Sequence, residues 1–214
     1  MINIETNRSI HIDDKQISTF IETGTAMFPM GVVFTKEELQ YINDIQIKLP
    51  QEQVIIGDAG EPNLLYVSRL MVDLPGEKPT LVNRPLSESI INILNDKIRQ
   101  KFFKKLLGKE KYLRRCQINR MTKNSFIGRH IDRDSNPDYD VAVVIHLGKQ
   151  FDGGEFVVYP DNNKSYTFRP NYGTVLISQC KIPHEVLTVN SDERVSLVFF
   201  LSDYLEENRR IKNH

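Results

Sequence analysis

The sequence predicts an α+β fold in which helices come first and an all-β core of roughly seven or eight strands follows. Two helical patterns lie before residue 112. After residue 112 the segments are short and rich in Val, Ile, Phe and Tyr, with turn sequences such as "FDGG" and "DNNK" between them. Short strands with this punctuation are typical of an antiparallel sandwich or barrel. We expect the helices to brace one outer face of that core.

The first helix is predicted within residues 35–49, "TKEELQYINDIQIKL". Thr35 and Glu38 have the spacing of a capping box, in which each side chain accepts a hydrogen bond from the backbone N–H of the other residue. Leu39, Ile42 and Ile45 then recur at helical spacing. Residues 1–30 have weak periodicity, so we expect an irregular arm or a strand there.

Residues 51–84 contain short segments broken by Gly and Pro, and "NLLYVSRLMV" among them predicts a strand. Residues 87–108 predict one continuous helix that ends at Gly108. Its apolar stripe consists of Ile90, Leu94, Ile98, Phe102 and Leu106. Its opposite face is basic, with Lys97, Arg99, Lys101, Lys104 and Lys105. We interpret that face as solvated rather than as a site for an anionic partner.

The later strands are predicted from seven β-rich segments: "YLRRCQINRM", "DVAVVIHLG", "EFVVYP", "SYTFRP", "GTVLISQ", "HEVLTV" and "RVSLVFFLS". The length of 214 residues suits one domain, 1–214. Within it, residues 1–111 hold an arm, helices and supporting strands, residues 112–204 the β core, and residues 205–214 a C-terminal tail.

Composition argues against several classes of partner. Lys plus Arg equals Asp plus Glu at 28 each, so no global field attracts nucleic acid or an anionic membrane surface. No apolar run reaches membrane-spanning length, and the first residues lack a secretory signal. Cys116 and Cys180 lack zinc-ligand spacing, and we expect free thiols in a reducing compartment. We therefore expect a cytoplasmic protein, and the oligomeric state stays open.

A metal site is predicted from "GRHIDRD", because His130 and Asp132 lie two residues apart and share one face of an extended chain. Two His and one carboxylate leave open coordination positions and suit non-haem Fe(II). Two residues compete for the third ligand, His146 inside an apolar strand and His184 in "KIPHEVLTV".

Arg194 and Ser196 favour His184 as the third ligand. Their spacing places a guanidinium and a hydroxyl on one strand face, where they can clamp the distal carboxylate of a 2-oxo acid. An oxygenase that draws electrons from such a cosubstrate needs this anchor beside the metal. His184 starts the strand pair that would return Arg194 to the metal.

These motifs resemble the 2-oxoglutarate/Fe(II)-dependent dioxygenase superfamily, and most of all its prolyl-4-hydroxylase-like branch with the bacterial PKHD-type hydroxylases. The likeness covers about residues 112–203 and is carried by "INRM…FIGRHID", "FDGGEFVVY", "RPNYGTVLIS" and "PHEVLTV", with His184 and the Arg194-x-Ser196 pair. It implies a double-stranded β-helix, the jelly-roll or cupin-like core, over residues 112–204.

The resemblance also implies an enzyme, a hydroxylase that uses Fe(II), 2-oxoglutarate and O2, with ascorbate as a reductant. It implies that His130, Asp132 and His184 are the catalytic metal ligands and that Arg194 and Ser196 bind the cosubstrate. Met121 stands where relatives carry a Tyr, so Gln117 and Asn119 are the nearby polar candidates for cosubstrate contact. The presence of Asp132 favours hydroxylation over halogenation.

The expected substrate is a small molecule, either a free amino acid or a natural-product intermediate. Candidate substrate contacts are Arg69 and Arg120 for a carboxylate, Asp134 for an amine or guanidine, and His146 in the cavity wall. One alternative is a prolyl residue in a peptide or protein. Another is a non-catalytic cupin-like module that binds a metal or a ligand. A nucleic-acid demethylase is disfavoured because the charge balance is neutral.

Overall fold

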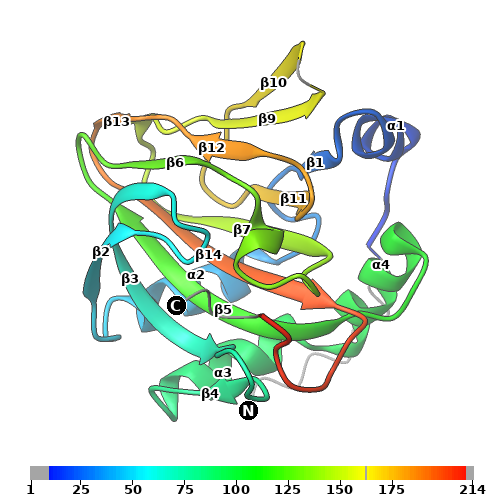
Figure 1. Cartoon of the computed structure of the whole chain (residues 1–214), viewed down its shortest axis with the longest axis horizontal. Helices are drawn as coiled ribbons and strands as arrows, with labels where there is room; N and C mark the ends of the chain where they lie inside the picture. The colour runs from blue at the N-terminus through cyan, green and yellow to red at the C-terminus, as the bar shows by residue number, and fades with distance from the viewer. Residues whose placement is uncertain (1–9, 162, 211–214) are drawn as a thin grey trace.

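The β-rich segments after residue 112 form strands in the computed structural model, which describes residues 10–161 and 163–210 (Figure 1). The strand predicted from "NLLYVSRLMV" is also confirmed, as part of β3. The strands are β1 (Thr25–Phe28), β2 (Glu52–Ile56), β3 (Pro62–Val72), β4 (Thr80–Leu81), β5 (Tyr112–Met121), β6 (Phe126–His130), β7 (Val141–Gly148), β8 (Asp152–Gly153), β9 (Phe156–Asp161), β10 (Lys164–Phe168), β11 (Val175–Gln179), β12 (His184–Val186), β13 (Val189–Ser191) and β14 (Arg194–Ser202).

Two antiparallel sheets share the long strand β3. The major sheet has the order β1-β11-β7-β14-β5-β3, with β2 and β4 also paired to β3. The minor sheet continues from β3 in the order β6-β12-β9-β10. This nearly closed barrel, with helices behind the major sheet, confirms the predicted jelly-roll core (Figure 1).

The two faces of the major sheet have different chemistry, as β14 shows. Its odd-numbered residues Val195, Leu197 and Phe199 join the helix-covered hydrophobic core. Its even-numbered residues include Arg194 and Ser196 and turn toward the space between the two sheets. Side chains of a strand alternate between faces, so one strand serves both the core and the cavity.

The helices are α1 (Asp14–Thr23), α2 (Lys36–Gln46), α3 (Leu86–Leu94) and α4 (Lys97–Leu107), with a 3₁₀ turn η1 (Asp132–Asp134). The predicted capping box of α2 is confirmed: Thr35 Oγ1 accepts from Glu38 N at 3.1 Å, and Glu38 Oε2 accepts from Thr35 N at 2.8 Å. Leu39, Ile42 and Ile45 are buried, as the helical spacing predicts.

Two expectations about the helices were wrong. Residues 14–23 form α1, where we expected an irregular arm or a strand; residues 1–9 lie outside the described part of the chain. The predicted helix over residues 87–108 is two helices, because Asn95 ends α3 and Asp96 caps α4 by accepting from Arg99 N at 2.8 Å. Gly108 ends α4 in the left-handed conformation, as expected.

The basic face of α4 also needs a correction, because Arg99 is not solvated. Its side chain is 2% exposed and forms ion pairs with Glu38 of α2 and with Asp96. Its guanidinium lies 4.2 Å from the ring centroid of Phe34. Arg99 therefore joins α4 to α2 and takes no part in an open cationic surface.

A buried ion pair joins the end of β3 to β5 and to the C-terminal segment. Arg114 donates to both carboxylate oxygens of Asp73, at 3.1 and 2.9 Å. Its Nη1 also donates to the backbone carbonyls of Tyr204 and Glu206. Asp73 Oδ2 accepts a further hydrogen bond from Asn136, four residues beyond Asp132. This Asp73–Arg114 cluster thus connects the segment after η1 with residues 204–206.

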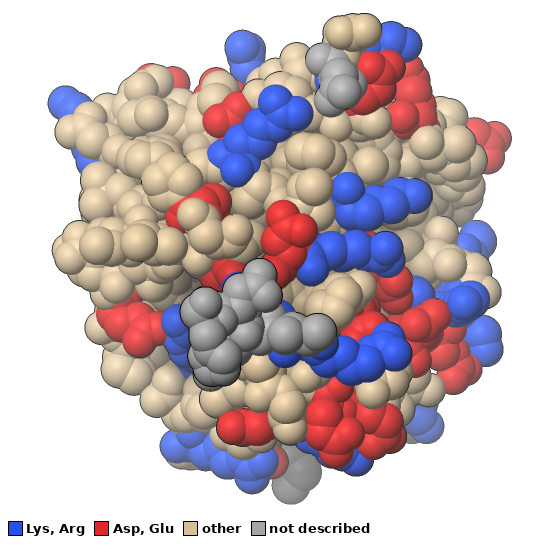
Figure 2. All heavy atoms as spheres, in the orientation of Figure 1, with Lys and Arg blue, Asp and Glu red and all other residues tan. Residues whose placement is uncertain are grey.

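Both cysteines are buried free thiols, as expected. In the part of the chain that the structure describes, no helix is long and apolar enough to cross a membrane. On the face shown in Figure 2, Lys and Arg side chains are interspersed with Asp and Glu.

Candidate metal centre

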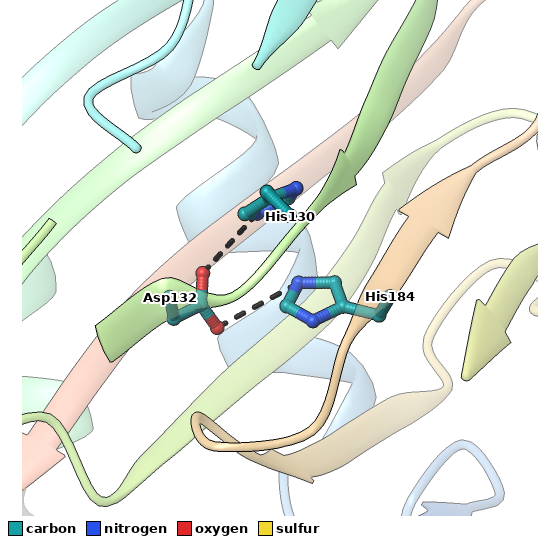
Figure 3. A group of neighbouring side chains, drawn as sticks. All are labelled: His130, Asp132 and His184. Atoms are coloured by element: carbon teal, nitrogen blue, oxygen red, sulfur yellow. Dashed lines mark ion pairs between the residues drawn. The ribbon is translucent and has the colours of Figure 1, made fainter. Parts of the chain in front are cut away.

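Two paired strands of the minor sheet bring two imidazoles together. His130 is the last residue of β6, His184 is the first of β12, and the two residues are register partners in this antiparallel pair. Their ring centroids are 4.3 Å apart. Asp132 follows at the start of η1, and its carboxylate points between the two rings (Figure 3).

The three side chains offer ligand atoms that all lie within 4.8 Å of one another. Asp132 Oδ1 is 3.3 Å from His130 Nε2, and Asp132 Oδ2 is 3.6 Å from His184 Nε2 (Figure 3). Asp132 and His184 are buried, and His130 is half-buried. The structure thus brings together the three residues that the sequence predicts, and it does so in a largely water-excluded place.

Each imidazole is oriented by its other ring nitrogen. His130 Nδ1 lies 2.8 Å from the carbonyl oxygen of Gly128, and His184 Nδ1 lies 2.9 Å from that of Ile182. A carbonyl only accepts hydrogen bonds, so both Nδ1 atoms carry the proton when the rings are neutral. The lone pairs of both Nε2 atoms then face Asp132, as metal-binding histidines require.

The pKa values of the three side chains are shifted by burial and by the charges of one another. Burial disfavours the charged form of His130, but the hydrogen bond and charge of Asp132 outweigh it and raise its pKa to about 9. Burial lowers the pKa of His184 despite the charge of Asp132. The pKa of Asp132 is lowered, because both histidines together outweigh the effect of its burial.

The donor set fits a divalent first-row metal ion. Two donors about 2.1 Å from an ion and at right angles to each other are about 3 Å apart, close to the spacing seen here. Asp132 Oδ2 is buried without a hydrogen-bond partner among the described residues. A buried carboxylate oxygen in that state costs free energy unless a cation satisfies it. Two imidazoles and one carboxylate on one side are the arrangement that suits Fe(II).

Arg194 is a buried cation surrounded by neutral groups. It is 1% exposed and contacts the Gly154 carbonyl at 3.1 Å, Ser196 Oγ at 3.3 Å and His146 Nε2 at 3.1 Å. Within residues 10–161 and 163–210 no carboxylate forms an ion pair with it. Burial lowers its pKa to about 10, so it stays charged at neutral pH. A buried guanidinium without a carboxylate partner among the described residues costs free energy, so this position suits an anionic group of a ligand.

His146 lies beside Arg194 and away from the metal ligands. Its Nε2 faces the guanidinium, while its Nδ1 is 3.4 Å from both the carbonyl oxygen and Oγ1 of Thr174. Burial and the charge of Arg194 hold the pKa of His146 well below 6.5. The ring is therefore neutral, and its Nε2 accepts a hydrogen bond from Arg194. Of the two competing histidines, the geometry groups His184 with His130 and Asp132.

One cavity of about 410 Å³ connects these features. It lies between the two sheets, and the β2–β3 hairpin forms one wall. From the predicted site residues it is lined by His130, Asp132, His184, Arg194, Ser196, Gln117, Asn119 and Arg69. Gln117 Nε2 donates to Asn119 Oδ1 at 2.7 Å, so these two side chains lie side by side on β5.

Three predicted substrate contacts are not among the described residues that line the cavity: Arg120, Asp134 and His146. Arg120 lies on the opposite face of β5, where it pairs with Glu193 and donates to Gln46 of α2. Met121, in the position of the relatives' Tyr, is fully buried with its Sδ 3.4 Å from Arg194.

Sequence reasoning missed Arg115 and Glu61, which also line the cavity. Arg115 shares the face of Gln117 and Asn119 because it lies two and four positions before them on one strand. That alternation was available in the sequence. Glu61 gave no such signal, because it lies in the turn of the β2–β3 hairpin.

Comparisons with known proteins agree with this geometry. A family model described as the 2OG-Fe(II) oxygenase superfamily matches residues 116–202. The crystal structure of an oxidoreductase of the 2OG-Fe(II) oxygenase family from Burkholderia pseudomallei is 48% identical, with a TM-score of 0.88 over 95% of this chain and 97% of that one.

Two further relatives are more distant. A PKHD-type hydroxylase of Prochlorococcus marinus (strain MIT 9301) is 25% identical over 132 residues, which make up 60% of this chain and 59% of that protein. The chain thus matches less than two thirds of this relative's length. A prolyl-4-hydroxylase from Pseudomonas putida has a TM-score of 0.59 at 15% identity, over 89% of this chain and 98% of that one. At that identity the likeness shows a shared fold alone.

Proposed function

Because this chain belongs to the 2OG-Fe(II) oxygenase family, we propose that it hydroxylates an unactivated C–H bond of a small molecule, either a free amino acid or a natural-product intermediate. The chain is a 2-oxoglutarate-dependent non-haem iron dioxygenase, and its cofactors are Fe(II), 2-oxoglutarate and O2. Because the chain belongs to this family of enzymes, we set aside the alternative of a non-catalytic cupin-like module.

One observation carries the proposal: the His130–Asp132–His184 group and the unpaired cation Arg194 line the same cavity. In our proposal the three residues hold Fe(II) through His130 Nε2, His184 Nε2 and the Asp132 carboxylate. Arg194 and Ser196 hold the distal carboxylate of 2-oxoglutarate, which supplies the anion that the buried guanidinium lacks. Gln117 and Asn119 are further polar contacts on the same wall.

The bound iron supplies the oxidation chemistry, in which 2-oxoglutarate, O2 and a C–H bond become succinate, CO2 and a C–OH group. The residues of the chain bind, orient and exclude water. His130 and His184 keep their Nδ1 protons on backbone carbonyls, so the Nε2 lone pairs stay directed at the ion. Arg194 fixes the far end of the cosubstrate, and the apolar wall of Val144, Val198 and Phe156 keeps water from the reacting atoms.

The size of the cavity favours a small substrate. A volume of about 410 Å³ falls at the lower end of the range for small-molecule sites and must hold both cosubstrate and substrate. The name of one structural neighbour, the prolyl-4-hydroxylase from Pseudomonas putida, suggests a second candidate, a prolyl residue in a peptide or protein. Such a substrate would occupy the cavity with one side chain and leave its backbone outside.

The test is succinate formation from 2-oxoglutarate with Fe(II) and ascorbate, followed by a mass screen for the gain of one oxygen. Free amino acids form one arm, and short proline-containing peptides form the other. Oxygen gain in the first arm supports the small-molecule proposal, and gain confined to the peptides supports the prolyl candidate. Absence of succinate from the iron-loaded protein contradicts the proposed reaction.

The variant Arg194→Met tests the cosubstrate site separately. It removes charge-assisted hydrogen bonds worth about 1.5–3 kcal/mol, so KM for 2-oxoglutarate should rise by about tenfold or more. Iron content should not change, because the residue does not contact the metal ligands. Arg169→Met, on the exposed loop after β10, is the control and should leave KM unchanged.

A further inference from the structure

A second cation faces the cavity from β5. Arg115 has a side chain that is 14% exposed, and its Nε and Nη2 both donate to Gln117 Oε1, at 3.0 and 2.8 Å. These two hydrogen bonds to Gln117 fix the orientation of the Arg115 guanidinium. The remaining Nη1 is directed to the Asp58 carboxylate, in the turn between β2 and β3.

Arg115 and Arg194 enter the cavity from well-separated backbone positions. On the paired strands β5 and β14, Arg115 is the register partner of Phe200, while Arg194 is the partner of Met121. Six residues of strand separate the two positions, or about 20 Å of backbone. The cavity therefore presents these two cationic side chains, each with its own backbone origin and its own hydrogen-bond partners.

Asp58 lies close to three arginines, of which Arg69 also pairs with Glu52. Its carboxylate pairs with Arg115, and its carbonyl oxygen accepts from Arg210 Nη2 at 2.5 Å. Burial raises the pKa of Asp58, but the charges of Arg115, Arg69 and Arg210 outweigh it and lower that pKa. The Asp58 side chain is 45% exposed, whereas Arg115 is nearly covered. The carboxylate is thus the partner that can leave, and the guanidinium is the one held in place.

From this arrangement we propose that Arg115 binds a carboxylate of the substrate, and that Asp58 occupies this place while no substrate is bound. The inference rests on the proposed hydroxylase function and names the chemistry of its substrate. A substrate carboxylate entering the cavity exchanges with the Asp58 carboxylate on Arg115. Asp58 then returns to solvent or to Arg69 and Arg210, so no buried cation is left without an anion.

Glu61 complements Arg115 with a negative charge in the same cavity. Its Oε2 accepts from Ala59 N at 3.1 Å and its Oε1 accepts from Asn63 Nδ2 at 2.9 Å, which hold the side chain inward. A carboxylate retains lone pairs for further donors. A free amino acid carries both an ammonium group and a carboxylate, and a cavity lined by Glu61 and Arg115 offers each of them a group of opposite charge.

The experiment uses the full-length iron-loaded enzyme with 2-oxoglutarate. The probes are the proteinogenic L-amino acids and, separately, the same compounds as carboxamides. Succinate formation above the substrate-free rate, with oxygen gain, should occur with acids and not with their amides. Turnover of amides at the rate of the acids, or no stimulation by any acid, overturns the inference. Substrate-free succinate formation in the same assay shows that the iron and cosubstrate sites work, so a failure of the acids then counts against the inference and not against 2-oxoglutarate turnover.

Two variants of the ion pair then separate substrate binding from a structural role. Arg115→Met should raise KM for the stimulating acid by about tenfold or more, and by clearly more than it raises KM for 2-oxoglutarate, because its only link to the cosubstrate wall is through Gln117. Asp58→Asn removes the internal competitor, so KM for the acid should fall. A salt bridge with a purely structural role predicts that both variants raise KM, and that result overturns the inference.

Arg120→Met is the matched control. Arg120 lies on the opposite face of the same strand, is 15% exposed, and pairs with Glu193, which is 40% exposed. The substitution therefore removes a comparable ion pair that does not face the cavity, and KM for the acid should not change. If Arg115→Met does not fold, Arg115→Lys and Arg115→Gln replace it. Arg115→Lys keeps the positive charge, so its KM for the acid should be lower than that of Arg115→Gln. A KM equal to that of Arg115→Gln contradicts the proposal.

Discussion

At the scale of single residues, the Asp132 carboxylate is held beside two imidazoles but keeps one oxygen that a cation would satisfy. Its Oδ2 is buried and has no hydrogen-bond donor among the described residues. The two histidines beside it use their second nitrogens on backbone carbonyls. All three side chains are thus positioned before any metal arrives, which lowers the entropic cost of binding one.

Asp132→Ala should abolish iron retention, because two imidazoles alone give a neutral and incomplete ligand set. Iron per chain, measured after anaerobic loading and desalting, should fall to near zero. Asp134→Ala is the control, since Asp134 shares η1 with Asp132 but does not line the cavity. Equal iron in both variants would assign the metal to other ligands.

His146 makes a prediction about pH. The pKa of His146 in the folded chain is well below 6.5. As the pH falls below about 6.5, His146 becomes protonated in the unfolded chain but stays neutral in the folded chain. His146 therefore costs stability on the acid side, and its contribution is unchanged above that pH. His146→Asn keeps a polar acceptor and does not titrate. Its Tm should fall less than that of the parent between about pH 7.5 and 5; parallel curves would contradict the buried neutral imidazole.

The candidate site was predictable at this scale as far as spacing and chemistry reach. The spacing of side chains on extended strands, and residue types that suit one metal ion and its cosubstrate, were enough to group four residues: His130, Asp132, His184 and Arg194. Arg120 and Arg115 both lie on β5, and only the alternation of side chains along that strand distinguishes them. Which face of β5 met the cavity depended on the parity of Gln117 and Asn119, and this places Arg115 inside and Arg120 outside.

At the scale of elements, strand pairing decides where the ligands lie. Register partners on β6 and β12 place His130 opposite His184, so a shift of one residue would turn one imidazole to the other face. The approach of β6 to β3 is also close. A Cβ built on Gly128 would meet the Pro62 carbonyl oxygen at 2.7 Å and Pro62 Cδ at 2.8 Å.

Gly128→Ala should therefore push β6 away from β3 and displace His130, two residues along. Both iron affinity and Tm should fall, since the obstacle is backbone and cannot rotate away. Titration of the apo enzyme with Fe(II) and a melting curve measure the two effects. Ser125→Ala, at the entrance to β6, is the comparison and should keep the iron affinity; an unaltered affinity in Gly128→Ala would mean that the sheet adapts.

Elements were predicted well where local chemistry decided them. The capping box of α2 and the runs of β-branched and aromatic residues in β7 and β14 needed no knowledge of distant residues. The break at Asn95–Asp96 was missed because the apolar stripe continues in helical register through it, while Asp96 caps a new helix. The helix α1 was missed although Asp13 and Gln16 form a capping box, because weak apolar periodicity hid it.

At the scale of the whole molecule, the Asp73–Arg114 cluster joins parts that lie far apart in the sequence. Both side chains are fully buried in this ion pair. Asp73→Ala would leave the Arg114 charge buried without its carboxylate, which should destabilise the fold by about 3–5 kcal/mol. Urea unfolding measures the change. Glu110→Ala, whose pair with Lys104 lies at the surface, should leave stability nearly unchanged.

The same cluster has a consequence for how the catalyst could be lost. The carbonyls of Tyr204 and Glu206 complete the shell of Arg114, and Asn136 ties the loop after Asp132 to the same carboxylate. A protease that cut the chain after Ser202 would leave the three proposed iron ligands in place, but it would free the segment that supplies two backbone acceptors to Arg114. Such a cut would disturb the proposed metal site indirectly, because the Asp73 carboxylate that Arg114 holds also positions Asn136 in the segment after Asp132.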